Sequence, residues 1–301
     1  MMGQPHQIHN QYVFDVESSA EMARLLDQDH MTTRAMGGLF PEFYDPDPKP
    51  NPESIDKQRV LDVACGPGGW VQQVAFTYPS IEVFGIDISH TMIEYAQAQA
   101  EVQHLKNAYF EEMDVTQPLK FPDDSFDFVN ARFMVGFLSR EQWPQVLQEM
   151  VRVTKPGGMV RLTDSDVAAT GVTNSRALER LTTLAAQACY RAGKGFGAGR
   201  ESSNIGITPM LSILLQRAGC LGVIEQPHVL NYSSGTTAYH ANYSNFRTGW
   251  LLMKPFLLKM GVTTNEEIDA LYEQFQIEML SEDFRGLWYF LSAWGQKPAK
   301  E

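Results

Sequence analysis

Val60-Leu61-Asp62-Val63-Ala64-Cys65-Gly66-Pro67-Gly68-Gly69-Trp70 is the stretch of sequence that decides the fold. It begins as a short apolar run that contains one acid, then breaks into a glycine-rich turn, and residues 71–75 are expected to begin a helix. A strand, a tight glycine turn and a helix are the opening of a doubly wound α/β domain. Gly66 and Gly68 let the backbone turn sharply and lie close to a ligand, because neither residue carries a Cβ atom. The N–H groups at the start of the helix would then point toward that ligand.

The acid inside the strand narrows the choice of ligand. A dinucleotide-binding turn follows the pattern G-x-G-x-x-G/A, whereas Val71 occupies its third position here. The Asp62 carboxylate is an unfavourable neighbour for a pyrophosphate and a favourable one for an ammonium or sulfonium cation. The pattern Asp-x-x-x-Gly-x-Gly after a strand resembles the first motif of the class I S-adenosylmethionine-dependent methyltransferases.

A second acid ends the next apolar run, residues 81–87, about twenty residues after the glycine turn. At that distance a doubly wound fold places the carboxylate that binds both ribose hydroxyls, and we assign this role to Asp87. Asp87 or Ser89 could instead cap the following helix, and the two roles are compatible. Ile88 and Met92 are expected to pack on the adenine face.

Two further motifs continue the resemblance. In the family, an Asp before a small apolar residue accepts the adenine amino hydrogen, which implies this role for Asp114 with the Val115 backbone close by. The turn at residues 122–127 and the Pro-Gly-Gly turn at residues 156–158 also match, and Asn130 is assigned to the cofactor as well. The motifs occur in the family's order over residues 60–164, so the chain is identified as a member of this family, with S-adenosylmethionine as cofactor and S-adenosylhomocysteine as product.

The resemblance implies a doubly wound, seven-stranded α/β sheet that is mostly parallel, with one antiparallel strand. We divide the chain into an N-terminal helical lid with a proline-rich linker (1–52), the cofactor-binding core (53–232, with a helical excursion at 167–206), a helical substrate cap (233–283), and the last strand with its tail (284–301). The lid is expected to hold two short helices, from Glu21 and from Met31, and Tyr12 or Arg24 could touch a ligand.

The segment before the last strand is rich in aromatic residues. Tyr239, Tyr243, Phe246 and Trp250 are predicted to line the acceptor site, although packing of the cap onto the sheet would also explain them. His240 is the first candidate for a general base and Tyr12 is a second, but a lone histidine is often structural.

Composition excludes several other classes of protein. The net charge of −12, without a basic stripe, argues against binding to nucleic acid. No long apolar run could span a membrane, and the first ten residues lack the pattern of a signal peptide, so we expect a cytoplasmic protein. The three cysteines are scattered, and the fourth strand ends in Asn130-Ala131-Arg132 without an acid, so we predict no metal site. The expected partner is a small-molecule substrate, and the sequence does not decide whether the chain forms a homodimer.

The predicted function is transfer of a methyl group from S-adenosylmethionine to an oxygen or carbon atom of a small, hydrophobic or aromatic metabolite. Two alternatives remain. The chain could be a cyclase or methyltransferase-cyclase acting on a terpenoid or polyketide, or a non-catalytic S-adenosylmethionine-binding partner subunit.

Overall fold

The computed structural model describes residue 13 and residues 18–40, 58–166 and 170–300. Within these ranges the strands are β1 (Arg59–Val63), β2 (Glu82–Asp87), β3 (Ala108–Glu112), β4 (Phe126–Arg132), β5 (Thr154–Asp164), β6 (Val172–Thr173), β7 (Leu221–Asn231) and β8 (Gly286–Gln296). The helices are α1 (Ser19–Ala35), α2 (Gly69–Thr77), α3 (His90–Val102), α4 (Trp143–Val153), α5 (Arg176–Arg191), α6 (Leu211–Arg217), α7 (Tyr239–Lys259) and α8 (Asn265–Met279). Short 3₁₀ turns lie at Met134–Gly136 and Thr208–Met210.

One mixed sheet organises the molecule. Its order is β3-β2-β1-β4-β5-β8-β6, and β7 pairs with β8 on the other side. The pairs from β3 to β5 are parallel, whereas β8 runs antiparallel to β5, β6 and β7. The predicted mostly parallel α/β sheet is confirmed. The two-residue strand β6 is an addition to the seven strands expected, because Val172 and Thr173 extend along Leu287 and Gly286 at the start of β8.

Helices cover both faces of the parallel part of the sheet. Val60 packs with Trp70 and Val74 of α2 on one face, while its neighbour Leu61 packs with Trp143 of α4 on the other. Alternate residues of β1 are therefore buried in opposite layers, as expected for a strand at the centre of a doubly wound sheet.

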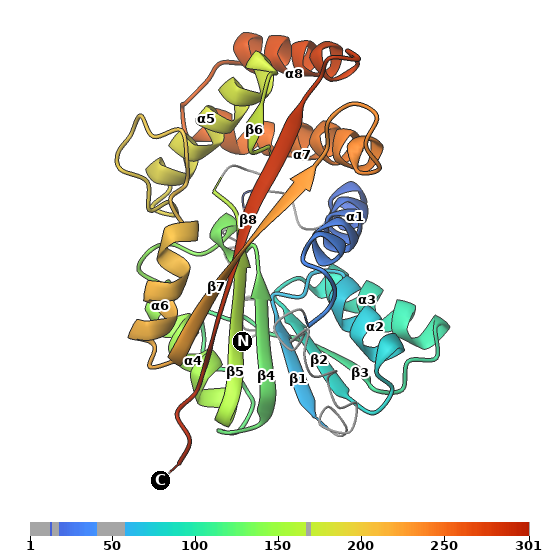
Figure 1. Ribbon diagram of the computed structural model, residues 1–301, viewed down its shortest axis with the longest axis vertical. Coiled ribbons are helices and arrows are strands. Elements are labelled where there is room, and N and C mark those ends of the chain that lie inside the picture. Colours follow the sequence, from blue (N-terminus) through green and yellow to red (C-terminus); the bar gives the residue numbers. More distant parts are fainter. Residues whose placement is uncertain (1–12, 14–17, 41–57, 167–169, 301) are drawn as a thin grey trace, which may run out of the picture.

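The cap has a hydrophobic core of its own. It brings together α5, α7 and α8, with Leu181, Trp250 and Phe275 among its buried residues, and Trp288 of β8 joins it from the sheet. Helix α5, which was assigned to an excursion of the core, contributes Leu181 to this cap cluster and Ala186 and Cys189 to the core cluster. Figure 1 shows β8 running from these helices down to the base of the core.

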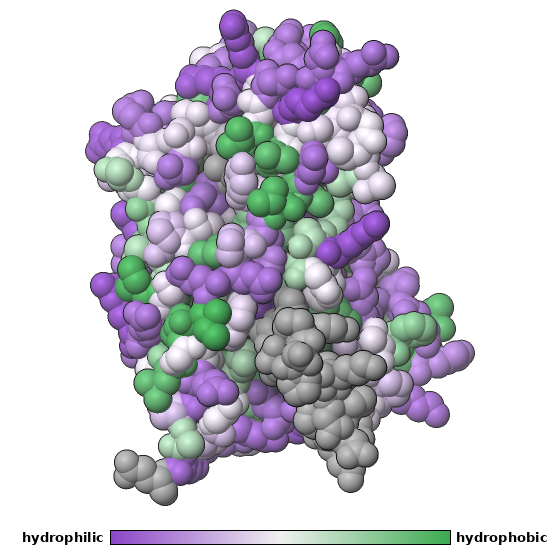
Figure 2. All heavy atoms as spheres, viewed as in Figure 1, coloured by the Kyte–Doolittle hydropathy of each residue, from purple (hydrophilic) through white to green (hydrophobic). Residues whose placement is uncertain are grey.

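The outer strands present an apolar surface on one side. Figure 2 shows apolar side chains over β7 and β8, where Ile224, Val229 and Tyr289 are exposed. In the described part of the chain, no helix has both the length and the apolar character needed to cross a membrane.

The N-terminal segment folds differently from the prediction. One continuous helix, α1, replaces the two short helices, because residues 26–31 contain neither Gly nor Pro to interrupt it. The helix ends at Ala35 with Met36 as its C-cap, and Gly37 and Gly38, which follow, take positive φ angles. The predicted linker at residues 41–52 lies outside the described residues.

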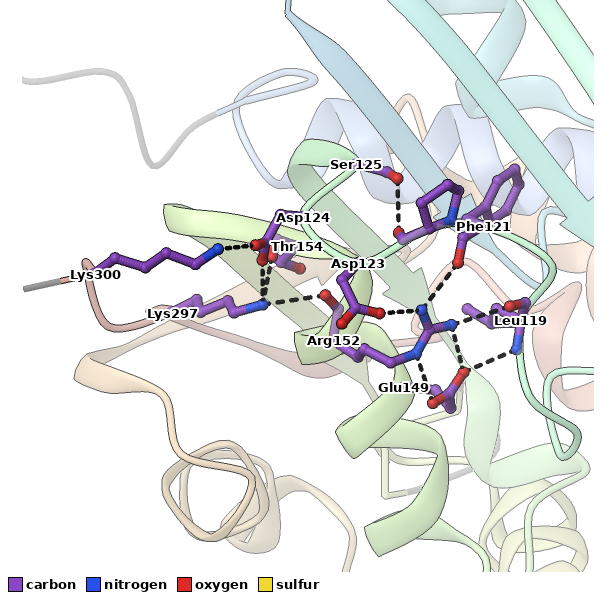
Figure 3. Close-up of polar contacts among 11 residues, drawn as sticks. Leu119, Phe121, Asp123, Asp124, Ser125, Glu149, Arg152, Thr154, Lys297 and Lys300 are labelled. Carbon is purple, nitrogen blue, oxygen red and sulfur yellow. Dashed lines mark hydrogen bonds and ion pairs between the residues drawn. The ribbon is translucent and has the colours of Figure 1, made fainter.

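The turn at residues 122–127 is held from two sides (Figure 3). Arg152 of α4 donates to the carbonyl oxygens of Leu119 and Phe121 and forms ion pairs with Glu149 and Asp123. Lys297, just after β8, forms an ion pair with Asp124 and donates to the carbonyl oxygens of Arg152 and Thr154. The end of the described chain is therefore fastened to the core.

Candidate functional site

The glycine turn after β1 is fixed by the acid that ends β2. Asp87 accepts hydrogen bonds from the backbone N–H groups of Gly66 and Ser89, both at 2.9 Å. Ser89 in turn caps α3, because its Oγ accepts from the N–H of Met92 at 3.3 Å. Burial raises the pKa of the Asp87 carboxyl, and these N–H donors oppose the rise. Asp87 thus orders the loop and remains at the surface of a cavity.

Gly68 is required for a reason that the sequence does not reveal. Its φ is +77°, and a Cβ atom there would lie 2.5 Å from the ring of Phe110 and 3.0 Å from the Cβ of Ala96. Gly68 is not among the residues that line the cavity, whereas Gly66, Pro67 and Gly69 are. Packing of β3 and α3 beneath the turn, rather than close approach of a ligand at Gly68 itself, excludes a side chain here.

A cavity opens at the carboxyl ends of β1, β2 and β4, where doubly wound domains bind their ligands. We call it the cofactor cavity, and its walls are formed by Leu25, Gln28, Asp29, Asp62, Ala64, Cys65, Gly66, Pro67, Gly69, Asp87, Ile88, Met92, Asp114, Val115, Thr116, Arg132, Phe133, Phe137 and Gln142. The structure therefore brings together seven of the nine residues predicted to bind the cofactor. Gly68 and Asn130 are the two that do not line it.

Asn130 lies beneath the cavity and holds one of its carboxylates. It is fully buried, its Nδ2 donates to Asp62 Oδ1 at 2.7 Å, and its Oδ1 accepts from Arg161 Nε at 2.8 Å. Arg161 also donates to the carbonyl oxygen of Leu39 at 3.0 Å. Burial raises the pKa of Asp62 to about 7, although Arg132, Asn130 and Arg161 act to lower it. Asn130 is thus placed to position Asp62 rather than to touch a ligand.

Helix α1 closes the cavity from above. It packs against α2 of the core and α7 of the cap (Figure 1), and its side chains Leu25, Gln28 and Asp29 form one wall of the cavity. Asp29 makes an ion pair with Arg132 from the end of β4, and Arg132 also donates to Thr33 Oγ1 at 3.0 Å. Within the described residues, Asp29 Oδ2 is buried without a hydrogen-bond partner. A carboxylate oxygen is therefore available to a cationic ligand here.

A second cavity adjoins the first. We call it the acceptor cavity, and it is lined by Val13, Arg24, Gln28, Phe133, Val135, Gly136, Asp164, Ser165, Ala185, Cys189, Ile205, Asn245, Phe246, Gly249, Trp250, Met253 and Trp288. Gln28 and Phe133 line both cavities. Phe133 has a φ of +57°, a backbone conformation that costs a bulky residue about 1–2 kcal/mol. One of the two residues that the cavities share is thus held in a strained backbone conformation.

The four predicted substrate residues divide into two pairs. Phe246 and Trp250 line the acceptor cavity. Tyr239 and Tyr243 do not, because their rings stack on each other with centroids 6.2 Å apart and the Tyr239 hydroxyl donates to the carbonyl oxygen of Met279 at 2.6 Å. For this second pair, packing within the cap explains the aromatic residues.

Of the two predicted bases, His240 lies among the described residues and is not brought to either cavity. His240 is exposed beside Tyr239 and lines neither cavity. Tyr12 lies outside the described residues. Arg24, which was considered as a ligand contact, lines the acceptor cavity but is engaged by Glu21, Gln28 and Asn245. In the described part of the chain, no three His, Cys, Asp or Glu residues are grouped so as to hold a metal ion.

Several residues that line these cavities were not predicted from the sequence. Gln28 and Asp29 lie on a helix with no recognisable motif, and Arg132 ends β4 and Phe133 follows it, where only the absence of an acid was noted. Asp164, which ends β5, was given no role from the sequence. Its place at the carboxyl end of a parallel strand was the signal that could have identified it.

Comparison with known proteins assigns part of the chain to a family. A family model described as a methyltransferase domain matches residues 60–158. The demethylmenaquinone methyltransferase of Geobacillus kaustophilus (strain HTA426) is 39% identical over 103 residues, which are 34% of this chain and 43% of that protein. The protein of the same name from Deinococcus radiodurans is 36% identical over 115 residues, which are 38% of this chain and 46% of that one.

The chain thus spans less than half the length of these relatives. Among solved structures, the YcgJ protein from Bacillus subtilis superposes with a TM-score of 0.49 at 15% identity, covering 82% of this chain and 97% of that one. The region that the family model matches ends before α5 and α7, so the two cap helices that line the acceptor cavity lie outside it.

Proposed function

We propose that this chain transfers the methyl group of S-adenosylmethionine to an oxygen or carbon atom of a small, hydrophobic or aromatic metabolite, since residues 60–158 match a methyltransferase domain. The observation that carries the proposal is the pair of adjoining cavities. One is lined by carboxylates and a glycine turn, the other by aromatic rings, and they meet at Gln28 and Phe133. The carboxylates of the first cavity would suit a cationic nucleoside, and the aromatic rings of the second would suit an apolar acceptor.

The residues of the cofactor cavity fit S-adenosylmethionine. Asp87 would accept from the ribose hydroxyls, while Ile88 and Met92 would pack on the adenine. Asp114, whose Oδ1 already accepts from the N–H and hydroxyl of Thr116, would face the adenine amino group. The ammonium end would lie near Asp62 and the unpartnered oxygen of Asp29.

The chemistry requires mainly alignment. When bound, S-adenosylmethionine supplies a methyl group on a cationic sulfur, which is already electrophilic. The protein can therefore accelerate transfer by holding the acceptor in line with that group and by excluding water. Helix α1 would help in both tasks, because Gln28 on its inner side lines both cavities.

The aromatic lining supports a ring-shaped or otherwise apolar acceptor. Phe133, Phe246, Trp250 and Trp288 contribute four aromatic side chains to the acceptor cavity. The relatives from Geobacillus and Deinococcus are named for demethylmenaquinone, and an acceptor of that general kind would suit such a wall.

The first experiment is calorimetric titration of S-adenosylmethionine and S-adenosylhomocysteine into the wild-type protein and the Asp87→Asn variant. We expect the wild type to bind both, and we expect Asp87→Asn to bind at least tenfold more weakly, because an amide accepts less well from two hydroxyls. Glu112→Gln is the matched control. Glu112 ends β3 directly beside Asp87 but lines neither cavity, so affinity should be unchanged. Absence of binding to the wild type would refute the proposal.

The mass of the product separates the alternatives. A methyltransferase adds one methyl group to its acceptor, a pure cyclase leaves the mass unchanged, and a non-catalytic subunit binds the cofactor and yields no product.

A further inference from the structure

We propose that Asp164 is the catalytic base of this chain, and that the acceptor cavity takes a flat, apolar ring compound with an ionisable hydroxyl group, such as a phenol or a hydroquinone. This inference rests on the proposed methyl transfer and adds its acceptor class and proton acceptor. The location of Asp164 is the first support. It ends β5, is 2% exposed, and lines the acceptor cavity beside Ser165.

The Asp164 carboxylate is held rigidly. Its Oδ2 accepts from the N–H of Val135 at 3.0 Å and its Oδ1 accepts from the N–H of Ser165 at 2.9 Å. The N–H of Met134 also acts on this carboxylate, and a carboxylate has about four acceptor positions, so a substrate hydroxyl still has a site at one of the oxygens. The backbone N–H of Phe133 donates to the carbonyl oxygen of Thr163 at 2.8 Å. This hydrogen bond holds Phe133, which lines both cavities, next to Asp164.

The charge environment suits a base that works near neutral pH. Burial raises the pKa of Asp164 to about 7, and the nearby carboxylate of Asp166 acts in the same direction, while the N–H groups of Ser165 and Val135 lower it. A general base is most effective when its pKa lies near the working pH.

Other titratable groups face Asp164 from the surrounding elements. Cys189 of α5 lines the same cavity, and burial raises the pKa of its thiol to about 12. Lys194 lies next to Cys189, with a pKa that burial lowers to about 8, and its ammonium group donates to the carbonyl oxygen of Phe137. Arg24 of α1 is paired with Glu21. Of these groups, Asp164 is the one whose pKa is placed at about 7.

The step balances with the groups named. As the hydroxyl oxygen forms its bond to the methyl carbon, its proton passes to an oxygen of Asp164. The electron pair of the broken carbon–sulfur bond stays on sulfur. The products are a methyl ether, S-adenosylhomocysteine and a protonated carboxyl group, which returns its proton to water.

The rings of the cavity indicate the shape of the acceptor. Phe133 stacks on Trp288 with centroids 5.8 Å apart, and the Trp288 indole N–H donates to Ser165 Oγ at 2.8 Å. The other indole differs, because Trp250 Nε1 is buried and has no hydrogen-bond partner among the described residues. A second oxygen on the acceptor, as in a hydroquinone, would satisfy this donor.

The decisive test compares phenol with 4-nitrophenol, whose hydroxyl is far more acidic, as acceptors for the wild type and Asp164→Asn at saturating S-adenosylmethionine. For phenol we expect kcat of the variant to fall on the order of 10²–10³-fold, as for loss of a general base. For 4-nitrophenol, which needs no base once ionised, we expect a loss of less than about tenfold. Wild-type kcat with phenol should rise with pH up to about 7, since the base acts when deprotonated, and this limb should vanish in Asp164→Asn.

Two controls keep the outcomes distinct. Asp166→Asn removes the neighbouring carboxylate, which lines neither cavity. This variant should lose no more kcat with phenol than with 4-nitrophenol. Binding of phenol, followed by quenching of tryptophan fluorescence with S-adenosylhomocysteine present, should be retained in Asp164→Asn. Equal losses for both acceptors, or none for either, would overturn the role of Asp164. Methylation of neither phenol despite cofactor binding would overturn the acceptor class, and failure to bind the cofactor would overturn the methyltransferase proposal itself.

Discussion

The cofactor cavity and the acceptor cavity share Gln28 and Phe133, but they are built in different ways. The cofactor cavity is formed largely by loops that directly follow β1, β2 and β3, and four carboxylates line it. The acceptor cavity collects side chains from α1, α5, α7, β5 and β8, and most of them are apolar. The first is a product of local backbone geometry, whereas the second exists only when distant elements have packed together.

The largest expected effect is a pH dependence that distinguishes the two cavities. Burial raises the pKa of Asp62 and of Asp164 to about 7. Between the ordinary carboxyl pKa and 7 the folded protein keeps protons that the unfolded chain releases, so the free energy of unfolding should fall as pH rises from about 4 to 7. Each carboxylate contributes as much as about 4 kcal/mol to this fall.

The cofactor should act on only one of these carboxylates. A cationic ligand beside Asp62 favours its charged form, so saturating S-adenosylmethionine should remove most of the contribution of Asp62 and leave that of Asp164. Urea unfolding at several pH values, with and without cofactor, on the wild type, Asp62→Asn and Asp164→Asn measures this. An unchanged slope in both variants would show that neither carboxylate is perturbed.

A smaller effect is expected from a single methyl group beneath the cofactor cavity. Gly68→Ala combines a positive φ with a clash against Phe110, and should reduce the free energy of unfolding by about 2–4 kcal/mol and weaken cofactor binding. Gly157→Ala is the matched control, because Gly157 has the same φ of +77° but nothing within 4 Å of the added Cβ. It should cost about 1 kcal/mol, measured in the same urea series. Equal costs for the two variants would remove packing as the reason for Gly68.

The smallest effect compares two indoles of the acceptor cavity. Trp288→Phe removes a hydrogen bond to Ser165, whereas Trp250→Phe removes a donor without a partner. We expect Trp288→Phe to destabilise the protein by about 1 kcal/mol more than Trp250→Phe, as followed by thermal unfolding. Cofactor affinity should be the same in both variants, since neither residue lines the cofactor cavity. The reverse order of stability would mean that Trp250 has a role in the fold that its contacts do not explain.

The sequence predicted the residues of the cofactor cavity better than those of the acceptor cavity. Asp62, Gly66 and Asp87 were predicted because the chemistry of a strand end and a tight turn requires particular residue types at fixed spacing. Asp114 and the mostly parallel sheet were implied by the resemblance to a known family, and the structure confirms the sheet.

The acceptor side offered no comparable signal. An aromatic residue on a helix fits equally well against a ligand or against another helix, so Phe246 could not be told from Tyr239 without the packing. Asn130 was assigned to the ligand, but it lies beneath the cavity, where its Oδ1 accepts from Arg161 on the neighbouring strand. The position of these residues along the chain indicated that they lie near the site. Their packing in the fold decides whether each side chain faces a ligand or another side chain.

Strand β8 has a consequence for how the protein is made. It lies between β5 and β7, yet it is the last strand of the described chain to be synthesised. While a ribosome is still translating it, β5 and β7 present unpaired edges, and edges of this kind invite pairing with other chains. Because Trp288 also comes with β8, the acceptor cavity is completed at the same moment. A nascent chain can therefore form its cofactor-binding half early, but it gains a closed sheet and a place for its acceptor together, near the end of synthesis.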